Sequence, residues 1–87
     1  MKKKEFLLRA KDIRPLLQTH MGCIATDRIT VDGEKVGFCY REKTDGTHPD
    51  SGWRFFSGDE NDAYLDDPDN SSVFALNTIA NYDPDII

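Results

Sequence analysis

Apolar and polar residues alternate along residues 24–40, and an Asp-Gly pair divides this stretch into two β-rich runs. An Asp-Gly pair between such runs is typical of a two-residue type I′ turn, because both central residues need a positive φ. The pattern therefore predicts a β-hairpin that turns at Asp32 and Gly33. With Val31 opposite Glu34, one face of the hairpin carries the side chains that we expect in the core: Ile29, Val31, Val36, Phe38 and Tyr40.

The other strand and loop signals are shorter. Residues 5–9 (EFLLR) are apolar between charges, which suits an edge strand, and residues 10–17 suit a turn or short helix. Residues 42–50 (EKTDGTHPD) hold almost no apolar side chain and predict a loop. The run WRFF at 53–56 predicts a third strand, which ends at the Ser-Gly pair that follows it.

Two short helices are expected in the C-terminal half. Carboxylates are favourable in the first turn of a helix, so the acidic run predicts a helix near 59–65 capped by Ser57 or Asp59. A second helix near 72–81 follows from apolar residues spaced by about three. They are Val73, Leu76, Ile79 and Ala80.

The predicted fold is therefore α+β, with a small antiparallel sheet made of the hairpin 24–40 and the strand 53–56, and short helices near 59–65 and 72–81. The chain has 87 residues. A chain of this length buries only about 60–65% of its unfolded surface and does not support two cores. We expect residues 1–87 to form a single domain.

The cysteines and histidines predict no metal site. In the hairpin register Cys23 lies on the core face and Cys39 on the opposite one, so we expect no disulfide and a reducing compartment. Their spacing to His20 and His48 fits no zinc motif. Neither histidine lies in a motif with a Ser or Cys nucleophile, so we expect no enzyme, no metal and no cofactor.

Charge divides the chain into unlike halves. Residues 1–43 carry ten Lys/Arg against six Asp/Glu, whereas residues 44–87 carry one Lys/Arg against ten Asp/Glu. Nucleic acid needs clustered cations, so the acidic half favours a basic protein surface as partner, unless its charge serves only solubility. The basic start at residues 1–4 is followed by too short an apolar run for an export signal or membrane span. We expect a cytoplasmic protein.

The acidic run does not fit a known calcium loop. Read from Asp59, the EF-hand pattern needs an oxygen ligand, a glycine and a glutamate where this chain has Ala63, Tyr64 and Asn70. A looser, weak cation site stays open. It would use Asp62, Asp66, Asp67 and Asp69.

Aromatic side chains lie next to these carboxylates, in the stretch SGWRFFSGDENDAYLDDPDN at 51–70. Trp53 and Phe55 are core residues in one interpretation, with the acids on the solvent side of the next turn. In the other, Trp53 or Tyr64 lies at the rim of a groove, as in protein-binding hot spots. Both interpretations are compatible.

Several long strings resemble one known family. They are GCIATDRITVDG, VGFCYRE, DSGWRFFSGDE, YLDDPDN and LNTIANYDPDII, which fall in that family's order over residues 22–87. The family is the bacterial immunity protein 33 family, also known as domain of unknown function 2185. The resemblance implies a small protein that binds and blocks a toxin made by its own cell, and it implies no catalytic residues. The matching positions are Tyr40, Arg41, Glu42, Ser51, Gly52, Trp53, Phe55, Gly58, Asp59, Glu60, Asn77, Asn81, Tyr82, Asp83 and Pro84.

Two functional hypotheses follow. In the first, the acidic surface meets a basic face of a cognate protein toxin, such as a nuclease, through Trp53, Asp59, Glu60, Asp62, Tyr64, Asp66, Asp67 and Asp69. In the alternative, a small-ligand or metal-dependent accessory domain has a pocket lined by Arg41, Glu42, Trp53, Asp59 and Glu60. A structure separates them by whether these five side chains converge in a cleft.

Members of the resembled family usually continue past the equivalent of Ile86 and Ile87 with a short tail rich in Pro, Gly and Phe. If that tail completes the sheet, we expect this chain to expose a sheet edge or to cover it by forming a homodimer.

Overall fold

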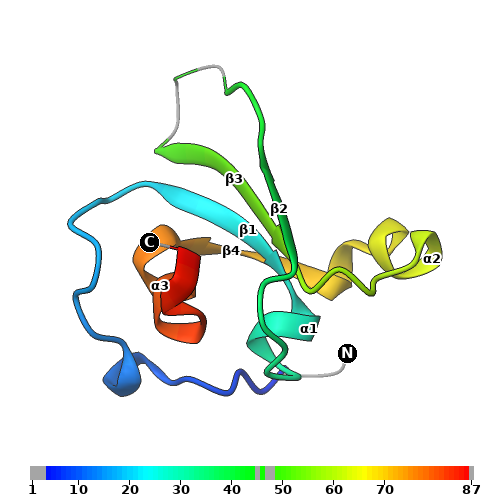
Figure 1. Cartoon of the computed structure of the whole chain (residues 1–87), viewed down its shortest axis with the longest axis horizontal. Coiled ribbons are helices and arrows are strands. Elements are labelled where there is room, and N and C mark those ends of the chain that lie inside the picture. The colour runs from blue at the N-terminus through cyan, green and yellow to red at the C-terminus, as the bar shows by residue number, and fades with distance from the viewer. Residues whose placement is uncertain (1–3, 45, 47–48, 87) are drawn as a thin grey trace.

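The computed structural model describes residues 4–44, 46 and 49–86. Four strands form one sheet in the order β2-β3-β1-β4 (Figure 1). The strands are β1 (Gly22–Thr26), β2 (Phe38–Arg41), β3 (Asp50–Phe56) and β4 (Ser71–Ala75). The helices are α1 (Asp27–Thr30), α2 (Asp62–Asp66) and α3 (Leu76–Tyr82), with 3-10 turns at Ala10–Asp12, Pro68–Asn70 and Pro84–Ile86. The predicted α+β class is confirmed.

The sheet is mixed, so the prediction of a purely antiparallel sheet is wrong. Strand β1 is central and pairs parallel with β3 on one side and antiparallel with β4 on the other. Strand β2 pairs antiparallel with β3 at the edge. Because β1 runs directly into α1, the chain leaves the sheet there and returns beyond β3, which places two strands of the same direction side by side.

The predicted hairpin at 24–40 is also wrong, because β1 continues into helix α1 where the second half of the first hairpin strand was expected. Asp27 starts a helical turn, and Gly33, with φ of 81°, ends it. The Asp32 N–H donates to the Asp27 carbonyl at 3.0 Å, and the Gly33 N–H donates to the Ile29 carbonyl at 3.1 Å. The positive φ that glycine allows is used here to close a helix and not to turn between two strands.

The core lies on one face of the sheet, between the strands and the helices α1 and α3. Side chains from the central strands meet those of the two helices there and are at most 3% exposed. Half-buried Val36 and Leu76 pack against this core, and Val31 is half-buried. Ile29 is a core residue as predicted. The buried hydrophobic cluster is Cys23, Ala25, Ile29, Phe55 and Ile79.

The two cysteines lie on the same face, which corrects the predicted opposite orientation. Cys39 pairs in register with Phe55, whose side chain belongs to the core with Cys23. Both thiols are free, and because β3 separates their strands, they lie about two strand spacings apart, too far for a disulfide. Burial raises the pKa of Cys23 to about 12, so this thiol stays protonated.

Phe38 and Tyr40 are not in the core, contrary to the prediction. They are 55% and 41% exposed, because β2 is an edge strand whose alternation turns them to the face away from α1 and α3. In register they lie beside Phe56 and Arg54 of β3, which also point to that face. The predicted strand 53–56 is confirmed and begins three residues earlier.

The second predicted helix, near 72–81, forms only in its second half. Its first residues build β4, where Val73 pairs with Ile24 and is 76% exposed. Helix α3 begins at Leu76, and its buried residues are Ile79 and Ala80, as the apolar spacing predicted. Main-chain pairing with the central strand has overridden the helical pattern for about the first turn.

The helix predicted near 59–65 forms as α2 but begins later. Its cap is Asn61, whose side-chain oxygen accepts the Tyr64 N–H at 2.8 Å, so the predicted caps Ser57 and Asp59 are wrong. The residues before Asn61 form a separate polar loop. Asn favours this position because its side chain satisfies an N–H that has no partner within the helix.

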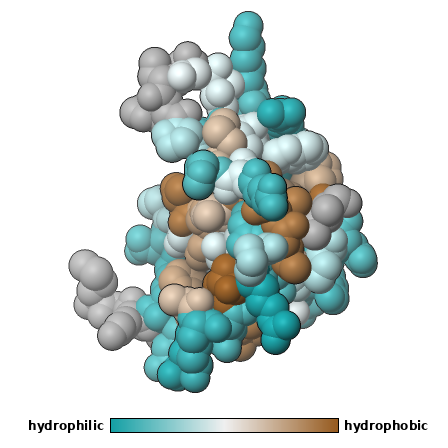
Figure 2. Space-filling view, turned by 90° about the vertical axis from the view of Figure 1, so that its left-hand side faces the viewer, coloured by the Kyte–Doolittle hydropathy of each residue, from teal (hydrophilic) through white to brown (hydrophobic). Residues whose placement is uncertain are grey.

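An N-terminal arm, residues 4–21, wraps around the side of the molecule that carries α3 (Figure 1). The structure describes all of this arm and shows no strand in it, so the predicted edge strand at 5–9 is wrong. Viewed from the side of the arm and α3, apolar patches lie between hydrophilic side chains (Figure 2). Leu16 and Met21 are exposed apolar residues of the arm.

Two asparagines of α3 hold this arm by its backbone. Asn77 Oδ1 accepts the N–H groups of Leu16 and Leu17 at 2.8 Å each. Asn81 Oδ1 accepts the Arg14 N–H, and both amide groups donate to the Arg14 carbonyl. At i and i+4 the two side chains share one face of the helix, so both can bond the backbone of the arm at residues 14–17.

We predict that Asn77→Ala releases the arm locally. It removes three hydrogen bonds to backbone groups, each worth about 1 kcal/mol at most in a partly exposed position. Hydrogen exchange at Leu16 and Leu17 should accelerate about tenfold or more, while β1 amides keep their protection. Asn61→Ala is the matched control because it removes an asparagine cap elsewhere. Unchanged exchange in the arm of Asn77→Ala would contradict this role.

Candidate functional site

The face of the sheet opposite α1 and α3 carries exposed side chains of the outer strands β2 and β4 beside half-buried ones of the central strands β1 and β3. We call it the open face, and its side chains are Ile24, Phe38, Tyr40, Arg54, Phe56 and Val73. Strand register places these residues on one side, because paired residues of neighbouring strands point the same way. Within the described part of the chain, both helices that bury residues in the core pack on the other side (Figure 1).

Three aromatic rings form the apolar centre of the open face. Tyr40 stacks on Phe56 with ring centroids 5.6 Å apart and planes within 12°. Phe38 lies 5.7 Å from Phe56 and 6.0 Å from Tyr40. Exposed aromatic clusters of this kind are costly in water and mark surfaces that bind another molecule.

A groove of about 360 Å³ runs between this cluster and α2. Tyr40 and Phe56 form its wall on the sheet, and Tyr64 and Leu65 form its wall on α2. Burial, with the nearby Asp27 second, raises the pKa of Tyr64, so its hydroxyl stays neutral. The groove is therefore an apolar slot with a phenol at its helical side.

The charge of the groove is set by Arg54 and its partners. Arg54 is only 11% exposed and donates to Asp50 and to Glu42, each at 2.9 Å. The hydrogen bonds that Arg54 donates to these carboxylates, Asp50 first, raise its pKa and keep it charged. Glu42 and Asp67 line the groove with Arg54, so carboxylates outnumber the one guanidinium there.

Helix α2 and the turn that follows it carry the four aspartates that the sequence proposed for partner binding. Asp62, Asp66, Asp67 and Asp69 are all exposed, and α2 buries no residue. Figure 1 shows α2 projecting from the end of the sheet. Among the described residues, no three His, Cys, Asp or Glu side chains are arranged to hold a metal ion, so these acids do not gather into the weak cation site considered above.

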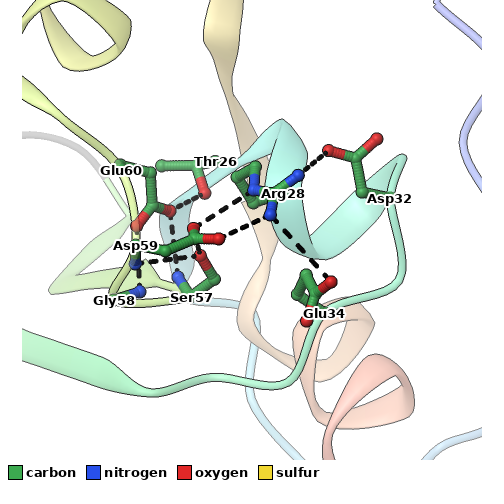
Figure 3. A network of polar contacts seen from close by, with 8 residues as sticks. All are labelled: Thr26, Arg28, Asp32, Glu34, Ser57, Gly58, Asp59 and Glu60. Atoms are coloured by element: carbon green, nitrogen blue, oxygen red, sulfur yellow. Dashed lines mark hydrogen bonds and ion pairs between the residues drawn. The ribbon is translucent and has the colours of Figure 1, made fainter.

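Asp59 is exposed, but its carboxylate is bound within the chain by neighbouring side chains (Figure 3). Its carboxylate accepts from Arg28 at 2.5 and 3.1 Å and from the Ser57 hydroxyl. Arg28 also pairs with Asp32 at 2.9 Å and lies 4.0 Å from Glu34. The Arg28 guanidinium, followed by the Ser57 hydroxyl, lowers the pKa of Asp59 to about 2. This network joins α1 to the loop that follows β3.

Glu60 completes the same network (Figure 3). It accepts the Thr26 hydroxyl at 2.5 Å and the N–H groups of Ser57 and Gly58 at 2.9 Å. Burial alone would raise the pKa of Glu60, but these hydrogen bonds outweigh it and the pKa is lowered. Gly58, with φ of 104°, allows the turn that aims both N–H groups at the carboxylate. The carboxylate anchors the loop after β3 to the end of β1.

Trp53 lies on the core face, so it is not beside Asp59 and Glu60. It is half-buried, stacks on Phe55 with centroids 6.2 Å apart, and lies 5.9 Å from the Arg41 guanidinium. It lines a second groove of about 380 Å³, with residues such as Leu17, Val36 and Ile86.

The five residues of the pocket alternative are not brought together in one cleft. Arg41 lies over Trp53 on the core face, while Glu42 lines the groove of the open face. Asp59 and Glu60 are bound to Arg28 and Thr26 in the loop network. The acids of α2, by contrast, do lie beside a groove, and Tyr64 and Asp67 line it.

Sequence reasoning missed the residues at the centre of this surface. Phe38 and Tyr40 were expected in the core, and Phe56 was not singled out. The signal that could have found them is the alternation along β2 and β3, which places aromatic side chains on both faces of the sheet. The few short helices of this chain cannot bury both faces, so one aromatic set stays exposed.

The fold and the open face define a small α+β domain whose exposed aromatic and acidic side chains suit binding of another molecule. Residues 23–87 match the family model described as Immunity protein Imm33 domain. The match covers most of the chain, so this protein belongs to that family of immunity proteins, as the resemblance indicated. Curated proteins and solved structures gave no significant match. No helix in the described ranges is long and apolar enough to span a bilayer.

Many positions that carry the resemblance have structural contacts. Ser51 Oγ donates to the Gly22 carbonyl at 2.6 Å, and the Tyr82 hydroxyl accepts the Leu8 N–H at 3.0 Å. Asp83 is buried and accepts the Val36 N–H at 3.0 Å. Asp59, Glu60, Asn77 and Asn81 have structural contacts too. Tyr40 and Glu42, with the core residue Phe55, are matching positions that line the groove of the open face.

We predict that Asp59→Asn makes the stability of the fold less dependent on pH in the acid range. The folded pKa of Asp59 is about 2, below its ordinary 3.8. A lowered pKa stabilises the fold fully above about pH 4, and this contribution is lost as the pH falls towards 2. The urea midpoint of the wild type should therefore fall over this window more steeply than that of Asp59→Asn.

Asp62→Asn provides the control for this measurement, because it removes an exposed acid of α2 outside the network. It should keep the wild-type slope between pH 4 and 2. If Asp59→Asn also keeps that slope, the pair with Arg28 does not contribute to stability.

Proposed function

We propose that this chain is an immunity protein that binds a protein toxin of its own cell and neutralises it by covering the toxin's surface. The binding surface is the open face together with the acidic helix α2. The single observation that carries this assignment is the stack of the exposed Tyr40 on the half-buried Phe56, in a chain that belongs to an immunity family. The protein acts without catalysis, in the cytoplasm where its toxin is made.

In this arrangement the aromatic side chains and the acidic side chains would contribute to binding in different ways. Aromatic side chains in the centre of an interface supply most of the binding energy, and charges at its rim set the encounter rate and the choice of partner. The rings of Phe38, Tyr40 and Phe56 lie on the sheet, and the acids of α2 lie at one end of it. A toxin with a basic face next to apolar side chains is the complementary partner, and a nuclease is a toxin of that kind.

The assignment is tested by co-expression with the toxin encoded beside this gene. The wild-type chain should restore growth, and Phe38→Ala combined with Tyr40→Ala should abolish protection while leaving the protein soluble. Each exposed aromatic anchor is worth about 2 kcal/mol or more in such interfaces, which is about thirtyfold in affinity. Persistent toxicity with soluble wild-type chain would contradict the proposal for that pair.

We predict that charge reversal on α2 slows association. Asp62→Lys combined with Asp66→Lys should lower the association rate constant for the toxin about tenfold at low salt, and the difference should shrink as salt is raised. Stopped-flow or surface-binding kinetics measures the association rate constant at low and at high salt.

Asp12→Lys combined with Asp85→Lys is the matched control for this charge reversal. These residues lie in 3-10 turns at the end of the molecule away from α2 (Figure 1). An equal loss in both double variants would show that net charge alone matters, and would contradict a binding role for α2.

A further inference from the structure

The groove on the open face combines three features that together specify a ligand. Its walls carry the stacked rings of Tyr40 and Phe56 on one side and Tyr64 on the other. Its volume of about 360 Å³ accommodates one or two side chains, at the lower end of the range for ligand pockets. Aromatic walls favour a flat or cationic group over a branched aliphatic one.

The charge of the groove selects between these occupants. Glu42 and Asp67 line it, and Arg54 is the only cationic residue among its lining. The Arg54 guanidinium is already shared between Glu42 and Asp50 at 2.9 Å and is only 11% exposed. Together with Asp50, the lining carboxylates carry three negative charges against this one guanidinium, so the net negative charge repels an anionic ligand and attracts a cation.

The charges near Tyr64 are also mostly negative. The nearby charges of Asp27, Asp32 and Glu60 act with burial to raise its pKa, against a smaller opposing effect of Arg28. The groove thus lies in a net negative field from its own lining and from the adjacent loop. Negative potential over aromatic rings is the environment in which a guanidinium binds well.

The opposite face of the sheet already shows the same chemistry within the chain. There the Arg41 guanidinium lies 5.9 Å from the Trp53 ring centroid and donates to the Ser51 carbonyl at 2.9 Å. A guanidinium can stack on a ring and still donate in its own plane, which an ammonium group does less well.

We propose that the groove accepts an arginine side chain of the partner protein, stacked against Tyr40 and Tyr64 with its charge facing Glu42 and Asp67. The inference rests on the proposed function in that the toxin supplies this arginine. It adds a definite chemical requirement: a basic side chain inserted into the open face, in addition to general attraction between a basic and an acidic surface.

The proposal is tested on the free chain with N-acetyl-arginine N-methylamide as the probe, followed by NMR titration. Binding in the millimolar range is expected, with the largest shifts at Tyr40, Phe56 and Tyr64. The neutral isostere N-acetyl-citrulline N-methylamide has the same shape without the charge, and it should bind at least about fivefold more weakly. Equal binding of both probes, or shifts centred elsewhere, would overturn the proposal.

Matched variants separate the groove from the general acidity of α2. Asp67→Asn keeps the side-chain acceptor that caps the turn at Pro68–Asn70 but removes the charge, so it should weaken the arginine probe up to about fivefold. Asp66→Asn removes a neighbouring charge that does not line the groove and should have less effect. Equal losses in both variants would overturn the groove assignment.

The aromatic wall is tested in the same way. Tyr40→Ala should abolish binding of the probe, whereas Tyr40→Phe retains the ring and should retain the affinity. Val73→Ala changes an exposed apolar residue of the same face outside the groove lining and should bind as the wild type does. Unchanged binding by Tyr40→Ala would exclude the stacking that the proposal requires.

The arginine groove and the proposed function can be refuted separately. If the chain protects against its neighbouring toxin but Tyr40→Ala and Asp67→Asn bind that toxin as tightly as the wild type, the arginine groove is wrong and the immunity assignment stands. If the arginine probe binds in the groove but the toxin is not neutralised, the groove stands and the immunity assignment fails for that pair.

Discussion

The packing of Ile29 and Ile79 onto Cys23 and Ala25 is the contact on which the rest of the structure depends. Small residues on the central strand let α1 and α3 approach one face of the sheet closely. A chain of 87 residues has helices enough to cover that face only. The opposite face must then remain in contact with water or with a partner, and it carries Phe38, Tyr40 and Phe56. One-sided burial thus produces both the core and the candidate binding surface.

The elements that depend on neighbouring residues could largely be predicted from the sequence. The strand at 53–56, the acidic helix, the stripe of Leu76, Ile79 and Ala80 and the buried Ile29 are all present. Each follows from periodicity and local chemistry, which act over a few residues. The α+β class follows from the same signals.

Pairing between distant strands could not be predicted, and the hairpin failed for that reason. An Asp-Gly pair permits either a hairpin turn or the end of a helix, and both need positive φ at the glycine. In the folded chain Asp27–Thr30 is helical and Gly33 follows it with φ of 81°, while Ile29, which either arrangement would bury, is fully buried. Likewise nothing local shows that β1 pairs parallel with β3, or that residues 71–75 form a strand because β1 has a free edge.

The candidate site was predicted in part, because charge is visible in a sequence and exposure is not. The acids of α2 are exposed as expected, but Asp59 and Glu60 bind Arg28 and Thr26 across the fold. Trp53 points to the core face, whereas Tyr40, expected inside, lies in the groove. Exposure of a side chain on a strand depends on which face the helices cover, and that is decided only in the folded chain.

The central claim is that the partner binds the open face and not the face covered by helices. NMR cross-saturation on labelled chain in complex with its unlabelled toxin measures this directly, because it reports which amides lie at the interface. We expect attenuated signals on β2, β3 and α2, around Tyr40, Phe56 and Leu65. Attenuation confined to α3 and the N-terminal arm would contradict it.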